Sequence, residues 1–170
     1  HQFRWFHDPD NGWPDLVWAT GKPSGGPYGL MDARGNWAVP PRFDHAQRLH
    51  EGRAIVSSGG KWGAVDAAGR VVIPLEHGWL GYFHNGYAVS GSFAPYASRK
   101  HGLIRLDGTV VAQPVYQAAR RPDRPGGAPR VLDGGIWYRI ENGKLVRDGE
   151  PDGTVIAACS QGLRVERQGA

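Results

Sequence analysis

The sequence predicts an all-β fold of about four hairpin-based repeats, arranged as an open or incomplete propeller-like or solenoid array with little or no helix. A hairpin-like stretch recurs along the 170 residues. The 26 Gly and 13 Pro are spread along the chain rather than pooled in a linker, as expected for short strands joined by tight turns. No sustained helical apolar period occurs, and the best helical candidate, 45–50, covers only about one and a half turns.

The hairpin is clearest at residues 61–74. Residues 64–66, Ala-Val-Asp, predict an outgoing strand, and the β-branched residues 71–73 predict the return strand. Between them, Asp-Ala-Ala-Gly at 66–69 has the composition of a turn, because the Asp can bond its own backbone and the Gly tolerates positive φ. Pro74 is expected to end the return strand, since proline lacks the N–H that a sheet needs.

The same hairpin recurs at regular intervals. Its leading aromatic-Gly pair begins at Tyr28, Trp62 and His101, with spacings of 34 and 39 residues. A degenerate copy begins 36 residues later at Trp137, without the Gly and with a turn one residue shorter. Fixed periods between about 20 and 50 residues indicate a repeat architecture. Too few copies are present for a closed ring, which favours the open array.

A further strand precedes each hairpin, so that each repeat is expected to contain about three strands. These strands are predicted at 15–19, 51–56, 85–90 and 129–132, and a last one at 162–166 has no hairpin after it. We interpret the chain as one domain, 1–170. Its predicted parts are an N-terminal cap or first strands at 1–27, repeats at 28–60, 61–99 and 100–135, and a degenerate C-terminal repeat at 136–170.

The order Lys-Trp-Gly-x-Val-Asp-x-x-Gly-Arg-x-Val-x-Pro at 61–74 resembles the signature of the bacterial WG-repeat family. The later part of that signature is matched by Pro-Arg-Phe-Asp at 41–44 and Glu-Gly-Arg-Ala at 51–54. The resemblance covers 28–117 well and 118–167 loosely. It implies an all-β repeat architecture used mainly for binding, without shared catalytic residues.

Three positions depart from the family's pattern. Tyr28 and His101 replace the signature Trp, and Arg105 replaces the Asp of the turn. These departures suggest diverged or capping copies of the same fold. Residues 137–144 also resemble one unit of the cell-wall-binding hairpin repeats. The repeat period elsewhere in this chain is much longer than the period of about 20 residues in those proteins.

Composition excludes several functional classes. The formal net charge of +4 is small and its basic residues are interleaved with acidic ones, which argues against nucleic acid as a partner. The single cysteine, Cys159, permits no internal disulfide and no cysteine-based zinc site, and it follows an apolar run that suggests burial. No apolar run approaches the roughly 20 residues of a membrane span. The chain starts at His1 rather than Met, which leaves the bacterial cytoplasm and the periplasm both open.

No catalytic, metal or cofactor motif is present. The sequence lacks a nucleophile elbow, a P-loop and a dinucleotide fingerprint, and its seven His lack the paired spacing of a zinc helix. The acidic stretch 8–12 fails as a calcium loop, because its Gly is fifth rather than sixth. We therefore expect a protein that is not an enzyme and needs no cofactor. A hydrolase would instead require one deep pocket with two or more convergent Asp, Glu or His side chains.

Aromatic residues divide into two groups. Trp18, Tyr28, Trp62 and Trp137 occur at repeat-like positions and are expected to pack in the core between repeats. Others are irregularly placed, and loops on a rigid scaffold commonly carry binding surfaces. Together with Phe93 and an Arg-rich loop after 119, they suggest a partner-binding set: Trp79, Tyr82, Phe83, His84, Tyr96, Arg120, Arg121 and Arg124.

These observations favour a non-enzymatic bacterial protein-binding module. The arginines would meet an acidic surface of the partner through bidentate contacts. A narrower hypothesis is an immunity or inhibitor protein that blocks a toxin or an enzyme. The alternative is a carbohydrate or cell-wall binder that stacks exposed Trp and Tyr rings on sugars. The oligomeric state is left open by the sequence.

Overall fold

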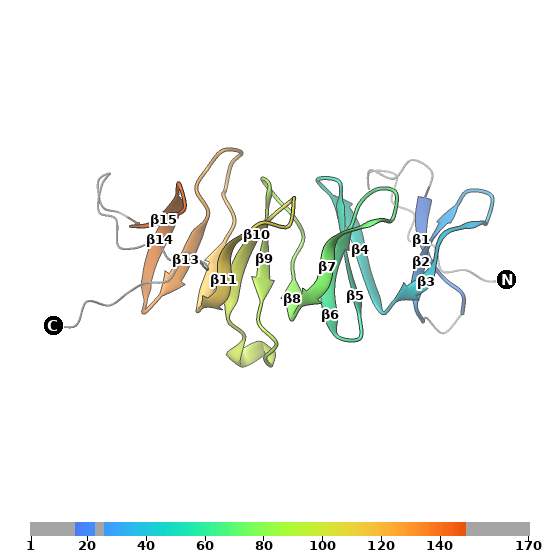
Figure 1. Cartoon of the computed structure of the whole chain (residues 1–170), viewed down its shortest axis with the longest axis horizontal. Coiled ribbons are helices and arrows are strands. Elements are labelled where there is room, and N and C mark those ends of the chain that lie inside the picture. Colours follow the sequence, from blue (N-terminus) through green and yellow to red (C-terminus); the bar gives the residue numbers. More distant parts are fainter. Residues whose placement is uncertain (1–15, 23–25, 149–170) are drawn as a thin grey trace. The chain divides into compact units, whose positions relative to one another are not determined.

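A computed structural model describes residues 16–22 and 26–148 (Figure 1). The described residues form antiparallel β-strands and, as their only helical element, the 3-10 turn η1 (Tyr96–Ser98). The predicted all-β fold is therefore confirmed. Most of the predicted N-terminal cap, the predicted strand at 162–166 and Cys159 lie outside the described residues.

Contacts divide the chain into two compact units, 1–82 and 83–170. Strands of the first unit are β1 (Leu16–Thr20), β2 (Tyr28–Asp32), β3 (Trp37–Phe43), β4 (His45–His50), β5 (Arg53–Ser58), β6 (Lys61–Val65), β7 (Val71–His77) and β8 (Trp79–Leu80). Strands of the second unit are β9 (Tyr87–Gly91), β10 (His101–Arg105), β11 (Val110–Tyr116), β12 (Ala118–Arg120), β13 (Arg130–Asp133), β14 (Ile136–Glu141) and β15 (Lys144–Arg147).

Neighbouring strands in sequence are also neighbours in the sheets. The first unit contains the sheet β1-β2-β3 and the sheet β4-β5-β6-β7, and the second contains β9-β10-β11 and β12-β13-β14-β15. The strands predicted before the hairpins are β1, β5, β9 and β13. Each described sheet is thus a meander, in which every connection between paired strands is local.

The turn at 66–69 forms as predicted. The N–H of Gly69 donates to the carbonyl of Asp66 at 2.9 Å, and Gly69 has a φ of 76°. Burial alone would raise the pKa of Asp66, but hydrogen bonds from the backbone and side chain of Arg70 and from the Ala68 N–H lower it. The Asp side chain therefore holds the turn as a carboxylate.

The prediction that Pro74 ends the return strand is wrong, because β7 continues to His77. Trp62 pairs with His77 while Ala64 pairs with Ile73, so the residues around Pro74 form a bulge opposite Gly63. A bulge leaves a residue without a ladder partner, and a proline without an N–H is tolerated there.

This bulge explains the Gly of the signature. A Cβ on Gly63 would lie 2.5 Å from the Ile73 carbonyl oxygen. The same close approach recurs at Gly29 and Gly102, where the nearest backbone oxygens would lie 2.4 and 2.3 Å away. The register of β2-β3 and of β10-β11 shifts at the corresponding place. The Gly and the Pro of the signature therefore lie opposite each other in the same bulge, and each is a residue type that the bulged backbone accommodates.

The helical candidate at 45–50 is also wrong, because these residues form β4. A segment of one and a half turns is too short to hold a helix alone, and pairing with β5 takes precedence. The pairing has a bulge between Ala46 and Leu49, where the Gln47 carbonyl accepts a hydrogen bond from the Trp18 indole at 3.0 Å. The unrecognised strand makes this sheet four-stranded rather than three-stranded.

Each unit has one hydrophobic core between its two sheets. In the first unit, Leu30 and Phe43 from β2 and β3 pack with Val56 and Val65 from β5 and β6. Gly69 packs against the same core, since a Cβ built on it would lie 2.3 Å from the Val39 side chain. In the second unit, buried side chains of β10 and β11 pack with those of the last sheet: Leu103, Ala112, Tyr116, Val131, Tyr138, Ile140 and Leu145.

The four repeat-like aromatics differ in burial. Trp18 is buried in the core of the first unit, and Tyr28 packs against that core. Trp62 is only half-buried and stacks on His45 of the same sheet, with ring centroids 5.7 Å apart. Trp137 is also half-buried, beneath a guanidinium. The expectation of core packing holds for Trp18 and needs correction for Trp62 and Trp137.

The last sheet repeats the geometry of β4-β7. Before β4, Asp44 donates its N–H to Ser57 and accepts a hydrogen bond from the Gly59 N–H in the β5-β6 turn. Before β12, Gln117 donates to Leu132 and accepts from the Gly135 N–H in the β13-β14 turn. The four sheets begin at other positions than the predicted repeat boundaries. Each predicted boundary falls between two strands that pair with each other.

Candidate functional site

Two connections in the second unit are longer than the turns at the equivalent places in the β4-β7 sheet, and one of them is as long as the β1-β2 connection, 21–27. Between β5 and β6, the paired residues Ser58 and Lys61 enclose the two residues 59–60. Between β9 and β10, the Ser92 N–H donates to the Lys100 carbonyl at 2.9 Å, and this pair encloses 93–99. The same turn position thus carries seven residues in place of two.

This longer connection, 93–99, exposes two aromatic rings. Phe93 is 67% exposed and Tyr96 is 87% exposed, the largest values among the exposed large hydrophobic residues. Tyr96 lies in η1, and the Arg99 guanidinium is 6.0 Å from the centre of its ring. The Lys100 N–H donates to the Ser92 hydroxyl, which ties the base of the connection together.

The second long connection joins β12 to β13. The paired residues Arg120 and Arg130 enclose 121–129, whereas His50 and Arg53 enclose only 51–52 between β4 and β5. One hydrogen bond within this connection and one from a residue outside it hold it in place. The Gly127 N–H donates to the Arg124 carbonyl at 3.0 Å, and the Asn85 side chain donates to the Pro122 carbonyl at 2.8 Å.

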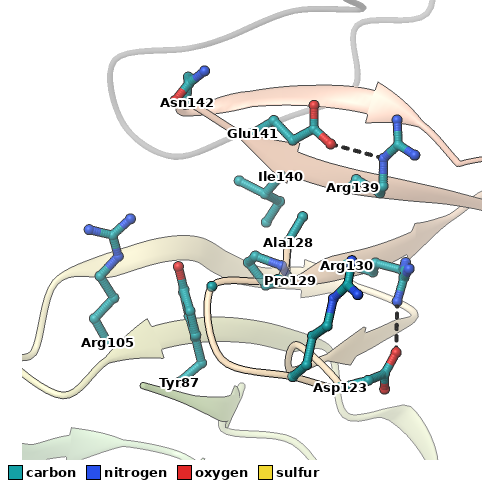
Figure 2. A pocket seen from close by; sticks show the side chains of 13 residues that line it. Tyr87, Arg105, Asp123, Ala128, Pro129, Arg130, Arg139, Ile140, Glu141 and Asn142 are labelled. Atoms are coloured by element: carbon teal, nitrogen blue, oxygen red, sulfur yellow. Dashed lines mark hydrogen bonds and ion pairs between the residues drawn. The ribbon is translucent and has the colours of Figure 1, made fainter. Parts of the chain in front are cut away.

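The connection 121–129 forms one wall of a pocket of about 780 Å³, which we call the arginine pocket (Figure 2). Its lining comes from β9, β10, the 121–129 connection, β13 and β14: Tyr87, Arg105, Asp123, Arg124, Gly126, Gly127, Ala128, Pro129, Arg130, Arg139, Ile140, Glu141 and Asn142. Arg105 and Tyr87 lie on one side of the view in Figure 2, and Arg130 and Arg139 lie on the other.

Two of the four arginines in the pocket are held by carboxylates. Arg130 contacts Asp123 at 3.2 Å and Asp148 at 2.9 Å. Arg139 contacts Glu141 at 3.0 Å and, more weakly, Asp148 at 3.8 Å (the first is drawn in Figure 2). These pairs fix the wall formed by β13 and β14.

The other two arginines make no ion pair with a described residue. Arg124 is exposed in the 121–129 connection. Arg105 ends β10, with its guanidinium 5.7 Å from the centre of the Tyr87 ring, a cation–π distance. The lining therefore carries four guanidiniums against two carboxylates, Asp123 and Glu141.

Arg105 occupies the position that Asp32 and Asp66 hold in the two preceding hairpins. The carbonyl of each Asp accepts from the N–H of the Gly three residues on, and its own N–H donates to the carbonyl of the residue four on. Arg105 makes the same two backbone bonds, with Gly108 and Thr109. The lost side-chain bond is supplied by Asp107, whose carboxylate accepts from the Thr109 N–H at 2.8 Å. That bond with Thr109 lowers the pKa of Asp107.

The predicted partner-binding set is divided between the two units. Trp79 and Tyr82 lie in the first unit, and the remaining residues lie in the second. Trp79 is half-buried, whereas Tyr82 is 45% exposed with its ring 5.0 Å from that of His50. His84 and Tyr96 are exposed. Phe83 is a correction, because it is 1% exposed and therefore not available to a partner.

The three predicted arginines have different environments. Arg124 lines the pocket, whereas Arg120 lies 4.6 Å from the centre of the Trp137 ring and Arg121 is half-buried. Arg130, Arg139 and Tyr87 were missed, because strand pairing brings them beside Arg124 from distant places in the sequence. Arg105 had a usable signal, since it departs from the turn aspartate of its own repeat.

Two carboxylates, Asp123 and Glu141, line the pocket, and each contacts a guanidinium. No group of three or more potential metal-binding side chains occurs in the part of the chain that the structure describes. Within the same residues, no helix is long and apolar enough to cross a membrane.

Outside the pocket, burial lowers the pKa of His77, with Glu76 acting in the opposite direction.

The family comparison matches the first unit and the start of the second. The model of the WG containing repeat matches residues 28–62 and again 62–89. Residues 28–89 are two WG containing repeats. Both matches begin at an aromatic-Gly pair, and they include the Gly–Pro bulges at Gly29 and Gly63. No curated protein and no solved structure matches the chain.

The WG repeats supply the scaffold that the sequence predicted. The longer connections, 93–99 and 121–129, both lie after the second matched segment. The candidate site is therefore built from the part of the chain in which the hairpins persist but the connections and the turn aspartate differ.

Proposed function

We propose that this chain is a non-enzymatic protein-binding module whose partner docks on the second unit. The proposal rests mainly on the side chains of two connections, which are seven and nine residues long where the β4-β7 sheet has two-residue turns. No residue of 93–99 or 121–129 belongs to the hydrophobic core cluster of the second unit. Surface loops on a rigid scaffold are common sites of recognition.

The side chains on these connections suit a protein partner. Phe93 and Tyr96 expose large rings to solvent, and Arg124 presents a guanidinium that lacks an ion-pair partner among the described residues. Aromatic and arginine side chains are frequent in the parts of interfaces that contribute most to affinity. Burial of the two rings by a partner would stabilise the complex by removing apolar surface from water.

The carbohydrate alternative uses exposed Trp and Tyr rings. Each Trp in the described residues is buried or half-buried, and the three exposed rings belong to Tyr82, Phe93 and Tyr96. This distribution favours a protein partner over sugar stacking. A toxin or an enzyme that the module inhibits is the narrower form of the proposal, and an added activity assay would test it once the partner is isolated.

Photo-crosslinking from a single position tests the proposed function. We would place a photoreactive phenylalanine analogue at Tyr96 and, as a matched control, at the exposed turn residue Ala67 in the first unit. Each protein is illuminated in lysate of the source cells. We expect a discrete protein adduct from position 96 that is much weaker from position 67, and loss of that adduct when Phe93→Ser is added.

Two results would argue against a protein-binding second unit. One is the absence of any discrete adduct from position 96 in a correctly folded protein. The other is an equal adduct from positions 67 and 96, because the crosslink would then report random collisions. A glycan-dependent quenching of Trp fluorescence together with no adduct would favour the carbohydrate alternative.

A further inference from the structure

We propose that the arginine pocket binds an acidic segment of the partner protein, with Arg105 and Arg124 receiving its carboxylates. This inference rests on the proposed protein-binding function and adds the chemistry of one contact. The ligand class is a peptide with at least two neighbouring acidic side chains.

The size of the pocket suits a short segment of chain. A volume of about 780 Å³ lies within the range of sites that hold a ligand of several side chains, roughly 300 to 1,000 Å³. Its wall is built mainly from polar groups, with Tyr87, Pro129 and Ile140 contributing apolar surface. The Ile140 N–H donates to the Pro129 carbonyl at 2.8 Å, which joins the connection 121–129 to β14.

Two of the four guanidiniums have no ion pair within the pocket lining, although the Asp107 carboxylate, outside the lining, interacts electrostatically with Arg105. Asp123, Glu141 and Asp148 compensate Arg130 and Arg139. Arg105 and Arg124 line the pocket without an ion pair to a described residue. Guanidinium groups bind carboxylates in a planar, bidentate manner, so each of these two arginines can receive one acidic side chain.

Arg105 is the residue that distinguishes this pocket from a simple surface depression. In the β2-β3 and β6-β7 hairpins the same position is a turn aspartate, Asp32 or Asp66, which accepts hydrogen bonds from backbone N–H groups. In this hairpin Asp107 has taken over a turn bond, and Arg105 is directed to Tyr87 and the pocket. The structure therefore keeps the backbone turn, while the side chain at this position changes from a carboxylate to a guanidinium.

The two arginines come from different elements, Arg105 from β10 and Arg124 from the 121–129 connection, so a segment with two acidic side chains can offer one carboxylate to each. A protein partner can also reach both features of the second unit. Tyr87 and Arg105 lie five residues along β9 and β10 from Ser92 and Lys100 at the base of 93–99, about 17 Å at the usual strand rise.

Binding of a fluorescein-labelled hexaglutamate peptide to the full chain, measured by fluorescence anisotropy, tests the proposal. We expect Arg105→Asp and Arg124→Gln each to weaken binding by about tenfold or more, the loss typical of a charged hydrogen-bonded contact. Arg105→Asp restores the aspartate of the other turns, so its melting temperature should match that of the wild type. Arg105→Gln provides the same test if the aspartate variant does not fold.

Two controls separate the pocket from general charge attraction. Arg34→Gln removes an exposed arginine from a turn in the first unit and should change binding less than twofold. Hexaglutamine should not bind. The proposal would be overturned if hexaglutamate did not bind, or if Arg34→Gln weakened binding as much as Arg124→Gln.

Competition with inorganic phosphate tests whether the pocket binds small anions instead. Displacement of the peptide by phosphate at lower concentration than by free glutamate would overturn the proposal in favour of a small-anion pocket. Failure of hexaglutamate to bind, together with a strong crosslink from position 96, would remove only the acidic-segment proposal. Failure of the crosslink alone would count against the protein-binding function and leave the charge preference of the pocket measurable.

Discussion

The β5-β6 turn and the β9-β10 connection occupy the same place in two repeats and differ in almost every physical respect. The first is a Gly-Gly turn, with φ of 57° and 74° at Gly59 and Gly60, and its backbone is held by Asp44. The second inserts 93–99 and exposes Phe93 and Tyr96.

The last sheet makes the difference more informative. Its β13-β14 turn is again a two-residue turn, Gly134-Gly135, with Gln117 in the role of Asp44. The β1-β2 connection is as long as 93–99, since the paired residues Thr20 and Tyr28 enclose 21–27, but its sequence contains no aromatic residue and no arginine. What distinguishes 93–99 is therefore its exposed rings rather than its length. We infer that the hairpins maintain the fold and that the altered connections serve the partner.

The largest effect on stability is expected from Gly63→Ala, because this substitution disturbs the backbone of the hairpin itself. A Cβ at this position would lie 2.5 and 2.8 Å from two carbonyl oxygens of the bulge at Ile73 and Pro74. Backbone atoms cannot move aside as a flexible side chain would. We predict a loss of about 3 kcal/mol or more in the free energy of unfolding, measured by urea denaturation.

Gly59→Ala is the matched control for that substitution. Gly59 also sits in a hairpin of the same sheet, but no atom lies within 4 Å of a Cβ built there. Its cost is limited to the positive φ of 57° and should be about 1 kcal/mol. Equal losses for the two alanine variants would mean that the Gly–Pro bulge is not the constraint described above.

A smaller loss is expected from Asp66→Ala. Its carboxylate accepts hydrogen bonds from the N–H groups of Ala68 and Arg70, and its side chain is largely shielded from solvent. Loss of these charged hydrogen bonds should lower the free energy of unfolding by about 1 to 2 kcal/mol. Asp66→Asn retains an acceptor and should lose less, which thermal denaturation of the two variants would measure.

Acid should weaken the same turn. Hydrogen bonds lower the pKa of Asp66 below its ordinary value of 3.8, so protonation is harder in the folded state than in the unfolded state. The resulting stabilisation is present above about pH 4 and is lost as the pH falls through the lowered pKa. Between pH 5 and pH 3, the difference in stability between wild type and Asp66→Asn should therefore shrink. A constant difference would contradict this origin.

The smallest effect on stability is expected from Tyr96→Ser. Its ring is 87% exposed and makes only a distant contact with Arg99. The melting temperature should change by less than about 2 °C, consistent with a loss within 0.5 kcal/mol. Phe83→Ser is the contrasting variant, because that ring is fully buried and its loss should cost several kcal/mol.

The sequence predicted the hairpins because their signals are local. The turn at 66–69 and the strands on either side depend on residues within one hairpin, and each was correctly identified. The strand β4 was missed because His45–His50 has no strand pattern of its own and is held by β5. Pro74 misled for a related reason, since only the register of β6 and β7 reveals a bulge that tolerates it.

The candidate site was only partly predictable. Arg124 and Tyr96 were identified because they interrupt the repeat pattern in sequence. Phe83 interrupts the pattern in the same way but is buried, and composition alone does not distinguish an exposed ring from a core ring. Arg130 and Arg139 reach the pocket through pairing of β13 with β14, which no local pattern specifies.

Replacing 93–99 by Gly-Gly tests the central claim most directly, because it converts the β9-β10 connection into the β5-β6 turn. Ser92 and Lys100 already pair in the way that Ser58 and Lys61 do, so the strands need no change of register. The measurement is the affinity of this variant for the partner isolated by crosslinking, alongside its melting temperature. We predict an unchanged melting temperature within a few degrees and a loss of partner binding. A folded variant that binds the partner as well as the wild type would contradict the claim that recognition lies where the repeats differ.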